Sequence, residues 1–173
     1  MKTFINTVKD SGVKTFIVHA RKGLLKGLSP RQNRNIPPLN YQKVYSLKED
    51  FPELEIIING GIKTISETKN HLNYVDGVML GRAAYDDPFM LSNIDSEVFS
   101  DTKIEISRKD LLNEYLDYVH LMTKKGYDPK IMLKHIFGLK KGEKDAKRFR
   151  VKVAEIMNSS KLIENKDELL SMV

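Results

Sequence analysis

The stretch Glu55-Ile56-Ile57-Ile58-Asn59-Gly60-Gly61 decides the fold. Its three consecutive isoleucines predict a buried strand over 56–58, and the two glycines predict a sharp turn where that strand ends. Thr64 and Glu67 follow at the spacing of an N-terminal capping box, which predicts that a helix begins there. The chain therefore passes from a strand through a glycine turn into a helix, an order typical of parallel βα units.

Similar elements are expected on both sides of this stretch. They are a helix over 2–11, a strand over 16–18, a helix over 41–51 and a strand over 78–80. The strands are short and almost wholly apolar, which is typical of a parallel sheet whose two faces are both buried.

The pattern changes after Pro88, beyond which no strand is expected. Helical periodicity returns over 107–125, 129–137, 143–158 and 164–172. We therefore predict an α/β domain over 1–94 and a helical domain over 95–173, with the boundary in the polar segment 94–106.

Positive charge is concentrated in two segments of the chain. Residues 21–38 have no steady period and contain several glycines and prolines, which predicts a long ordered loop, and the run 19–34 has five basic residues and no acid. Residues 121–152 carry eleven basic residues against three acids, although the whole chain has a net charge of only +6. This segregation favours a polyanionic partner, while the alternative is a pair of solubilising faces.

Composition excludes several classes of protein. A hydrophobic content of 40% is ordinary for a globular chain, and no apolar run approaches the roughly 20 residues that span a bilayer. The first residues do not resemble a signal peptide, so a cytoplasmic protein that avoids the membrane is expected. There is no cysteine, and the histidines have no partner at metal-ligand spacing, so neither a cysteine nucleophile nor a metal site is expected.

Two glycine turns are candidates for binding phosphate. Asn59-Gly60-Gly61 and Gly81-Arg82 each follow a predicted strand and precede a predicted helix. Glycine lets the backbone approach an anion, and paired phosphate-binding loops of this kind occur after the last two strands of (β/α)8 barrels. The alternative is tight turns without a ligand. His19 ends the first strand at the same edge of the sheet, where it is either a ligand contact or a hydrogen-bonded core histidine.

A series of ordered motifs resembles the tRNA-dihydrouridine synthase A family. The motifs are His19-Ala20-Arg21-Lys22, Gly27-Leu28-Ser29-Pro30, Asn33-Arg34, Ile36-Pro37-Pro38-Leu39, Ile58-Asn59-Gly60-Gly61-Ile62 and the run from Asp76 to Tyr85. The match is dense across 16–92 and continues more loosely through Gly138 to Arg150.

The resemblance implies a flavin enzyme that uses FMN and NADPH to reduce a D-loop uridine of tRNA to dihydrouridine. Its fold would be a (β/α)8 TIM barrel followed by a helical domain. The three strands expected here would be the last three of that barrel, so the chain is expected to begin in the helix before the sixth strand. It then lacks the family's flavin-contacting lysine and the cysteine that protonates uracil, and no catalytic residue is assigned.

The resemblance also assigns binding residues. The cofactor-binding residues would be His19, Asn59, Gly60, Gly61, Gly81 and Arg82. The tRNA-binding residues would be Arg31, Arg34, Lys147 and Arg150. Lys147 stands where relatives have arginine, so it keeps the charge but loses the fork geometry of a bidentate contact.

Three interpretations remain open from the sequence. The first interpretation is an enzyme: the chain is either a fragment of the synthase that is inactive alone, or one half of a split enzyme completed by an amino-terminal barrel half. The second interpretation is a non-catalytic tRNA-binding module. The third, another phosphate-binding barrel enzyme, leaves the two basic segments unexplained.

Overall fold

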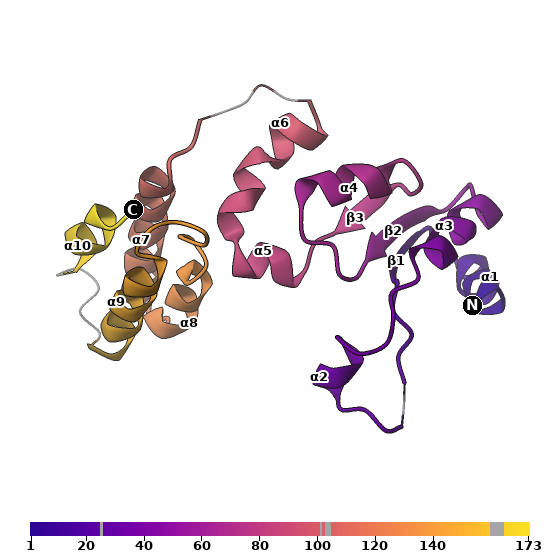
Figure 1. Cartoon of the computed structure of the whole chain (residues 1–173), viewed down its shortest axis with the longest axis horizontal. Helices are drawn as coiled ribbons and strands as arrows, with labels where there is room; N and C mark the ends of the chain where they lie inside the picture. Colours follow the sequence, from indigo (N-terminus) through magenta and orange to yellow (C-terminus); the bar gives the residue numbers. More distant parts are fainter. Residues whose placement is uncertain (25, 101, 103–104, 160–164) are drawn as a thin grey trace. The chain divides into compact units, whose positions relative to one another are not determined.

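The computed structural model describes residues 1–24, 26–100, 102, 105–159 and 165–173. These residues form two compact units, Met1–Gly81 and Arg82–Val173, which we call unit 1 and unit 2 (Figure 1). The division into an α/β domain over 1–94 and a helical domain over 95–173 stays a prediction. Each unit is described by itself below.

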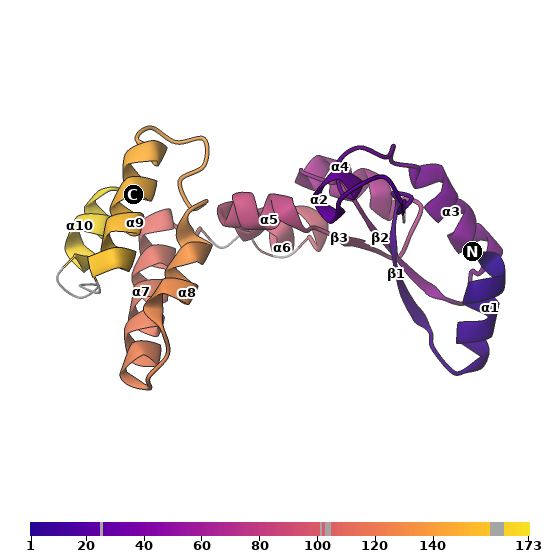
Figure 2. The same cartoon turned by 90° about the horizontal axis from the view of Figure 1, so that it is seen from below.

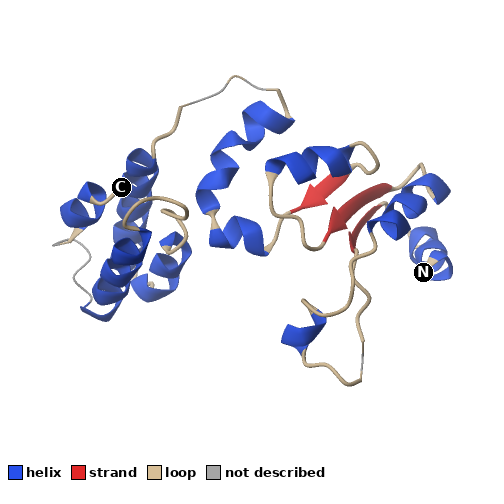
Figure 3. Cartoon of the chain, in the orientation of Figure 1, coloured by secondary structure: helices blue, strands red, loops and turns tan. Residues whose placement is uncertain are grey.

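Unit 1 is built on a three-stranded parallel sheet in the order β1-β2-β3 (Figure 3). Its elements are α1 (Lys2–Asp10), β1 (Thr15–His19), α2 (Pro30–Asn33), α3 (Tyr41–Asp50), β2 (Glu55–Asn59), α4 (Ile65–Leu72) and β3 (Gly77–Met79). In the register of the sheet, Ile57 of β2 is the partner of both Ile17 and Gly77. The prediction of three parallel strands alternating with helices is confirmed.

Two capping boxes fix where helices of unit 1 begin. The Thr64 hydroxyl accepts from the Glu67 amide at 3.1 Å, while the Glu67 carboxylate accepts from the Thr64 amide at 3.1 Å, as predicted. Ser29 and Gln32 form the same reciprocal pair at the start of α2. The prediction that 21–38 is loop throughout is therefore wrong over α2, and the Ser29-x-x-Gln32 spacing is the signal that would have revealed this short helix.

The core of unit 1 lies on one face of the sheet. Ile56 and Ile58 of β2 are completely buried against Val44 and Leu47 of α3 and Ile5 of α1. Figure 2 shows α1 and α3 together on one side of the strands.

The opposite face of the sheet is open among the residues that the structure describes. Ile17 of β1 is 59% exposed and Met79 of β3 is 45% exposed. The prediction that both faces are buried is therefore wrong for this chain, because successive side chains of a strand point to opposite faces and the described helices cover only one of them. β1 and β3 are also edge strands, each with one described neighbour.

A buried histidine joins the helices α3 and α4. His71 of α4 is 7% exposed, and its Nδ1 lies 2.6 Å from the hydroxyl of Tyr45 of α3. The Tyr41 ring packs edge-on against the imidazole, with 4.5 Å between ring centroids. Burial lowers the pKa of His71, and the nearby Glu67 carboxylate only partly offsets this effect. His71 is therefore a neutral packing residue of unit 1.

This histidine predicts an acid-sensitive unit 1. Because the folded pKa of His71 lies below its ordinary value of 6.5, the unfolded chain binds the proton more readily. The contribution of His71 to stability is complete when the pH is above the ordinary pKa. It is lost as the pH falls from the ordinary pKa toward the lower pKa of the folded state. We expect the free energy of unfolding to decrease between about pH 7.5 and 5.5, as measured by urea denaturation. His71→Gln should flatten this dependence, whereas the exposed His135→Gln should leave it unchanged; equal slopes for both variants would contradict the assignment.

Every secondary-structure element described in unit 2 is helical. These elements are α5 (Arg82–Asp86), η1 (Pro88–Asn93), α6 (Ile94–Val98), α7 (Arg108–Lys124), α8 (Pro129–Leu133), η2 (Lys134–Ile136), α9 (Ala146–Ser159) and α10 (Lys166–Ser171). The helix α6 occupies part of the segment expected to be a polar boundary. Asp95, one of the polar residues of that segment, lies in the first turn of α6, where its negative charge interacts favourably with the helix dipole. Asp101 of the same segment, and residue 164 of the last predicted helix, lie outside the described residues.

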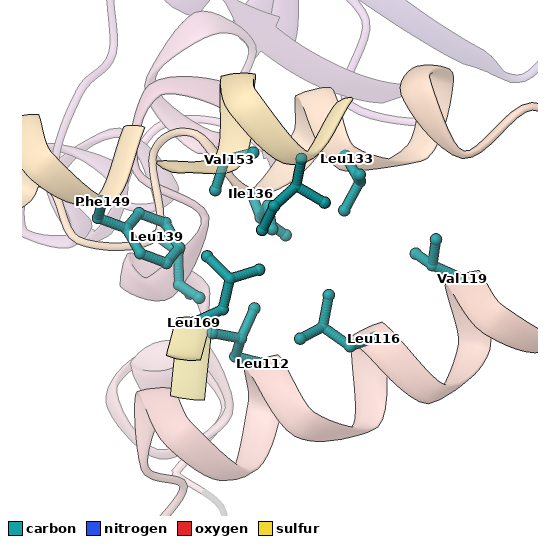
Figure 4. Close-up of a cluster of buried hydrophobic side chains, with 10 residues drawn as sticks. Leu112, Leu116, Val119, Leu133, Ile136, Leu139, Phe149, Val153 and Leu169 are labelled. Carbon is teal, nitrogen blue, oxygen red and sulfur yellow. The ribbon is translucent and has the colours of Figure 1, made fainter. Parts of the chain in front are cut away.

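The core of unit 2 is formed by the inner faces of α7 and α9. Leu112, Leu116 and Val119 repeat at helical spacing along α7 and are fully buried (Figure 4). Phe149 and Val153 of α9 point toward them. Leu133, Ile136, Leu139, Ile156 and Leu169 complete this cluster. Unit 2 therefore has a hydrophobic core of its own.

Candidate functional site

The carboxyl ends of β1 and β2 bring two of the predicted site features together. His19 ends β1 and Asn59 ends β2, and the two residues are partners in the parallel register. The Ala20 amide donates to the Asn59 carbonyl at 2.8 Å, which holds the chain beyond β1 against the end of β2. His19 and the turn Asn59-Gly60-Gly61 thus lie together at this edge, as the parallel arrangement predicted.

Both glycines of this turn are required by the structure itself. Gly60 and Gly61 have φ angles of 115° and 75°, which favour glycine. A Cβ atom at Gly60 would lie 3.0 Å from His19 Cε1, and one at Gly61 would lie 2.4 Å from a methyl group of Leu39. The Tyr41 hydroxyl donates to the Gly60 carbonyl at 2.9 Å and fixes the turn from the other side. The His19 ring therefore packs directly on the backbone of the turn.

Two backbone amides at this turn have no acceptor within the described structure. No described residue accepts a hydrogen bond from the amide of Gly61 or Ile62. The helix α4 begins at Ile65 after the Thr64 cap, as predicted, so Ile62, Lys63 and Thr64 lie between the glycine turn and the helix. The amides of Lys63 and Thr64 donate to the Glu67 carboxylate at 2.6 and 3.1 Å, so an acidic side chain already occupies the N-terminus of α4. Phosphate binding here would rest on the turn more than on the helix dipole.

His19 is exposed at this edge, which argues against the core-histidine interpretation. Its Nδ1 accepts a hydrogen bond from the Arg21 amide at 3.1 Å. The neutral imidazole then carries its proton on Nε2, which becomes a hydrogen-bond donor. A donor beside a glycine turn can contact the polar edge of a phosphate-bearing ligand.

The second predicted turn lies at the junction of the two units. Gly81 is the last residue of unit 1, and Arg82 is the first residue of α5 in unit 2. A Cβ atom at Gly81 would have no described neighbour within 4 Å, so packing does not require glycine there. The Asn59 side-chain amide donates to the Met79 carbonyl at 3.3 Å and ties the end of β2 to the end of β3. The participation of Gly81 and Arg82 in ligand binding stays a prediction.

The basic loop between β1 and α3 closes on itself at its base. Arg21 and Leu39 form an antiparallel bridge, and the Asn40 amide donates to the Ala20 carbonyl at 2.7 Å. Inside the loop, Asn33 exchanges two hydrogen bonds with the backbone of Leu24, at 2.7 and 2.8 Å. The prediction that this segment is ordered is confirmed outside the residue that is not described, with the short helix α2 inside it. Both tRNA-binding candidates of the loop, Arg31 and Arg34, have exposed side chains.

Arg21 supports this loop from within, a role that sequence reasoning missed. Its guanidinium donates to the Asn35 carbonyl at 3.1 Å and also to the Pro37 carbonyl. Its Nε is buried and has no hydrogen-bond partner among the described residues. In the sequence Arg21 is one basic residue of five, and only the return of the chain at Leu39 shows that it points into the loop.

Replacing Arg21 should loosen the loop. Hydrogen bonds from a charged donor each contribute about 1.5–3 kcal/mol, so Arg21→Ala is expected to speed amide exchange over 31–36 at least about tenfold. Hydrogen exchange followed by mass spectrometry measures this directly. Lys22→Ala, which removes an adjacent exposed charge, is the matched control and should leave exchange unchanged. Equal exchange in the two variants would show that Arg21 does not hold the loop.

In unit 2, the predicted tRNA-binding residues share one exposed surface of α9. Lys147 and Arg150 lie one helical turn apart and are both exposed, while Phe149 and Val153 of the same helix are buried. Neither Lys147 nor Arg150 forms an ion pair with any residue that the structure describes. By contrast, Lys152 of α9 pairs with Glu168 at 2.6 Å. The charges of Lys147 and Arg150 are therefore available to a polyanion.

Two other classes of site were sought in the described part of the chain. It contains no group of three or more histidine, aspartate or glutamate residues arranged to hold a metal ion. None of its helices is both long and apolar enough to cross a membrane.

Comparison with known proteins identifies the family to which this chain is similar. A family model described as dihydrouridine synthase matches residues 1–172. Proteins called tRNA-dihydrouridine(20/20a) synthase are similar to this chain: the one from Pseudomonas putida is 43% identical over 150 residues, which is 87% of this chain and 45% of the relative. Those from Pseudomonas syringae pv. tomato and Synechocystis sp. are 46% and 42% identical, each over 85% of this chain and 44% of the relative. The chain thus spans about half the length of the curated relatives it matches.

Proposed function

The chain belongs to the dihydrouridine synthase family, and from this premise we propose that it is the flavin- and tRNA-binding part of a tRNA-dihydrouridine synthase. The observation that carries the proposal is the meeting of His19 with the turn Asn59-Gly60-Gly61 at one edge of a parallel sheet. In the proposed enzyme β1, β2 and β3 are the last three strands of a (β/α)8 barrel, and the helices of unit 2 form a tRNA-binding domain. The open sheet face at Ile17 and Met79 suits the interior of such a barrel.

The residues at the sheet edge fit the phosphate end of FMN. The amides of Gly61 and Ile62 have no acceptor among the described residues. The His19 ring lies against the same turn, close to the backbone of Gly60. Asn59, Gly60, Gly81 and Arg82 complete the proposed set. When bound, the flavin supplies the hydride that reduces the uracil ring, with NADPH as the source of electrons. The proposed targets are the tRNA uridines at the positions 20 and 20a that appear in the names of the relatives.

Flavin titration tests this assignment. The chain is mixed with the amino-terminal half of a relative, and FMN binding is followed by the change in flavin fluorescence. We expect binding by the mixture, weakened by His19→Ala and unaffected by Lys63→Ala, an exposed residue beside the turn.

The alternative function, a tRNA-binding module without catalysis, is favoured by the ordered basic loop and by α9. It predicts RNA affinity with no flavin binding in any mixture.

The proposed RNA-binding residues predict a salt dependence. Arg31, Arg34, Lys147 and Arg150 would meet phosphates, and each neutralisation should flatten the slope of log affinity against log salt by about one unit. Arg31→Ala/Arg34→Ala and Lys147→Ala/Arg150→Ala should each flatten it by about two units for tRNA. The control, Lys2→Ala/Lys9→Ala, removes charges that pair with Asp50 and Glu53. A slope that is the same in all three variants would exclude the proposed surface.

A further inference from the structure

We propose that unit 2 has a second RNA-binding surface, at the turn between α7 and α8, where Tyr127 stacks on an unpaired base. We use the name α7–α8 surface for the exposed apolar and basic residues of this stretch, which are Tyr118, Leu121, Lys124, Lys125, Tyr127, Lys130 and Ile131. The inference rests on the proposed tRNA-binding function and adds to it a contact with bases, whereas Lys147 and Arg150 are proposed to meet phosphates.

Large apolar side chains are exposed on this surface. Tyr118, Leu121, Tyr127 and Ile131 are 49%, 52%, 58% and 60% exposed. They fall within one short stretch at the end of α7 and the start of α8, which pack against each other. Single exposed apolar residues are ordinary, but four within 14 residues, on two helices that pack against each other, make this stretch a candidate interaction site.

The turn that carries Tyr127 is well defined. Gly126 has a φ of 91°, and its amide donates to the Thr123 carbonyl at 2.9 Å, while the Tyr127 amide donates to the Met122 carbonyl at 3.1 Å. On the other side, the Asp128 carboxylate caps α8 by accepting from the Lys130 amide at 2.8 Å. The exposed ring of Tyr127 is thus held on a fixed backbone, so stacking costs little backbone entropy.

The helices on either side of this turn are also tied together. The Tyr115 hydroxyl of α7 donates to the Met132 carbonyl of α8 at 2.9 Å. The rings of Tyr115 and Tyr118 lie 6.0 Å apart, so Tyr118 also stands on a supported part of α7. The α7–α8 surface is therefore presented by two fixed helices.

The charges of this surface favour a nucleic acid over a protein partner. Lys124, Lys125 and Lys130 form no ion pair with any described residue. Residues 118–131 contain these three lysines and one acid, Asp128, which caps α8 and keeps its charge, so the stretch is net positive. The preceding acid, Asp117, pairs with Lys166 at 2.5 Å. Aromatic rings beside an excess of lysines are the combination that binds unpaired nucleotides, because the lysines meet phosphates while each base has a face that can stack.

The first test compares two RNA substrates with two variants of the full chain. Tyr127→Ala is expected to bind tRNA about tenfold more weakly than the wild type, whereas Tyr127→Phe keeps the ring and should bind within about twofold. Neither variant should change the affinity for an RNA duplex of the same length, which has no unpaired bases. Equal losses for tRNA and duplex, or an unchanged tRNA affinity for Tyr127→Ala, would overturn the inference.

The second test reports stacking directly and does not depend on the stability of an alanine variant. The chain contains no tryptophan, so Tyr127→Trp introduces a single tryptophan, which can be excited at wavelengths where the seven tyrosines of the wild-type sequence absorb little. We expect tRNA to quench it strongly. Phe99→Trp, at an exposed aromatic of unit 2 outside the surface, is the matched control and should be quenched little. Equal quenching of the two reporters would overturn the inference.

The outcomes separate this inference from the proposed function. If the wild-type chain binds tRNA and Lys147→Ala/Arg150→Ala weakens it but Tyr127 has no effect, only the α7–α8 surface is wrong. If the wild-type chain binds no tRNA at any salt concentration, both are wrong. Binding of a protein through this surface with no response to RNA would replace the inference by a protein partner.

Discussion

The 173-residue chain alone, incubated with tRNA, FMN and NADPH, is expected to form no dihydrouridine above the background without protein. Reduction of the uracil ring requires a proton as well as a hydride, and a placed general acid contributes about 10²–10⁴-fold to such a step. The family resemblance assigns this role to a cysteine, and this chain has none. The proposed cofactor contacts centre on His19 and Gly61 and would hold only the phosphate end of the flavin. The isoalloxazine ring would then have no proposed contact that positions it against the uracil. Mass spectrometry of nucleosides released from the tRNA measures the product.

The amino-terminal half of a relative should supply the lysine and the cysteine that the family resemblance assigns to that half. Dihydrouridine formation should appear if the two pieces close one barrel, and it should disappear again when the cysteine of the added half is replaced by alanine. His19→Ala in this chain should reduce the restored activity, while Lys63→Ala should not. Robust turnover by the chain alone would refute the proposal that the proton donor lies in the amino-terminal half. It would require a proton donor within these 173 residues.

The second large effect concerns the core of unit 2. Phe149→Ala is expected to destabilise unit 2 by about 3–5 kcal/mol, because a fully buried aromatic ring is removed and the surrounding leucines cannot fill the space completely. Val151→Ala is the matched control on the same helix, since Val151 is 51% exposed. It should change stability by less than about 0.5 kcal/mol.

Because unit 1 has its own core, the measurement must report on unit 2 alone. Hydrogen exchange resolved by mass spectrometry, followed over α7 and α9 as urea is added, meets this requirement. A loss of protection in α9 at much lower urea for Phe149→Ala, with β2 unchanged, is the expected result. Similar losses for Phe149→Ala and Val151→Ala would mean that α9 does not pack as Figure 4 shows.

Much of unit 1 follows from local signals in the sequence. The isoleucine run 56–58, the capping box at Thr64 and the helix ending before Pro52 are all short-range patterns, and each predicted element is present. The meeting of His19 with Asn59 also follows from the sequence, because parallel strands place their carboxyl ends at one edge. The flavin and tRNA roles of these residues stay predictions.

The features that sequence reasoning missed depend on distant parts of the chain. An apolar strand such as 16–18 can be covered by other elements on one face or on both faces. The residues of the strand do not show which elements pack against it. Arg21 supports the loop only because the chain returns at Leu39, eighteen residues later. Conversely, Ser29 and Gln32 carried a local signal for α2, but the many glycines and prolines around them suggested a loop.

The order of the strands along the chain has a consequence for how unit 1 folds. Asn59 of β2 bonds to Met79 across a separation of 20 residues, whereas Thr15 of β1 bonds to Glu55 across 40. Doubling the length of a closed loop costs about 0.6 kcal/mol of chain entropy, so the β2-α4-β3 part should assemble first and β1 should join it afterwards. His19 would then reach the glycine turn only in the last step, which makes the site the latest part of unit 1 to form and the first to open.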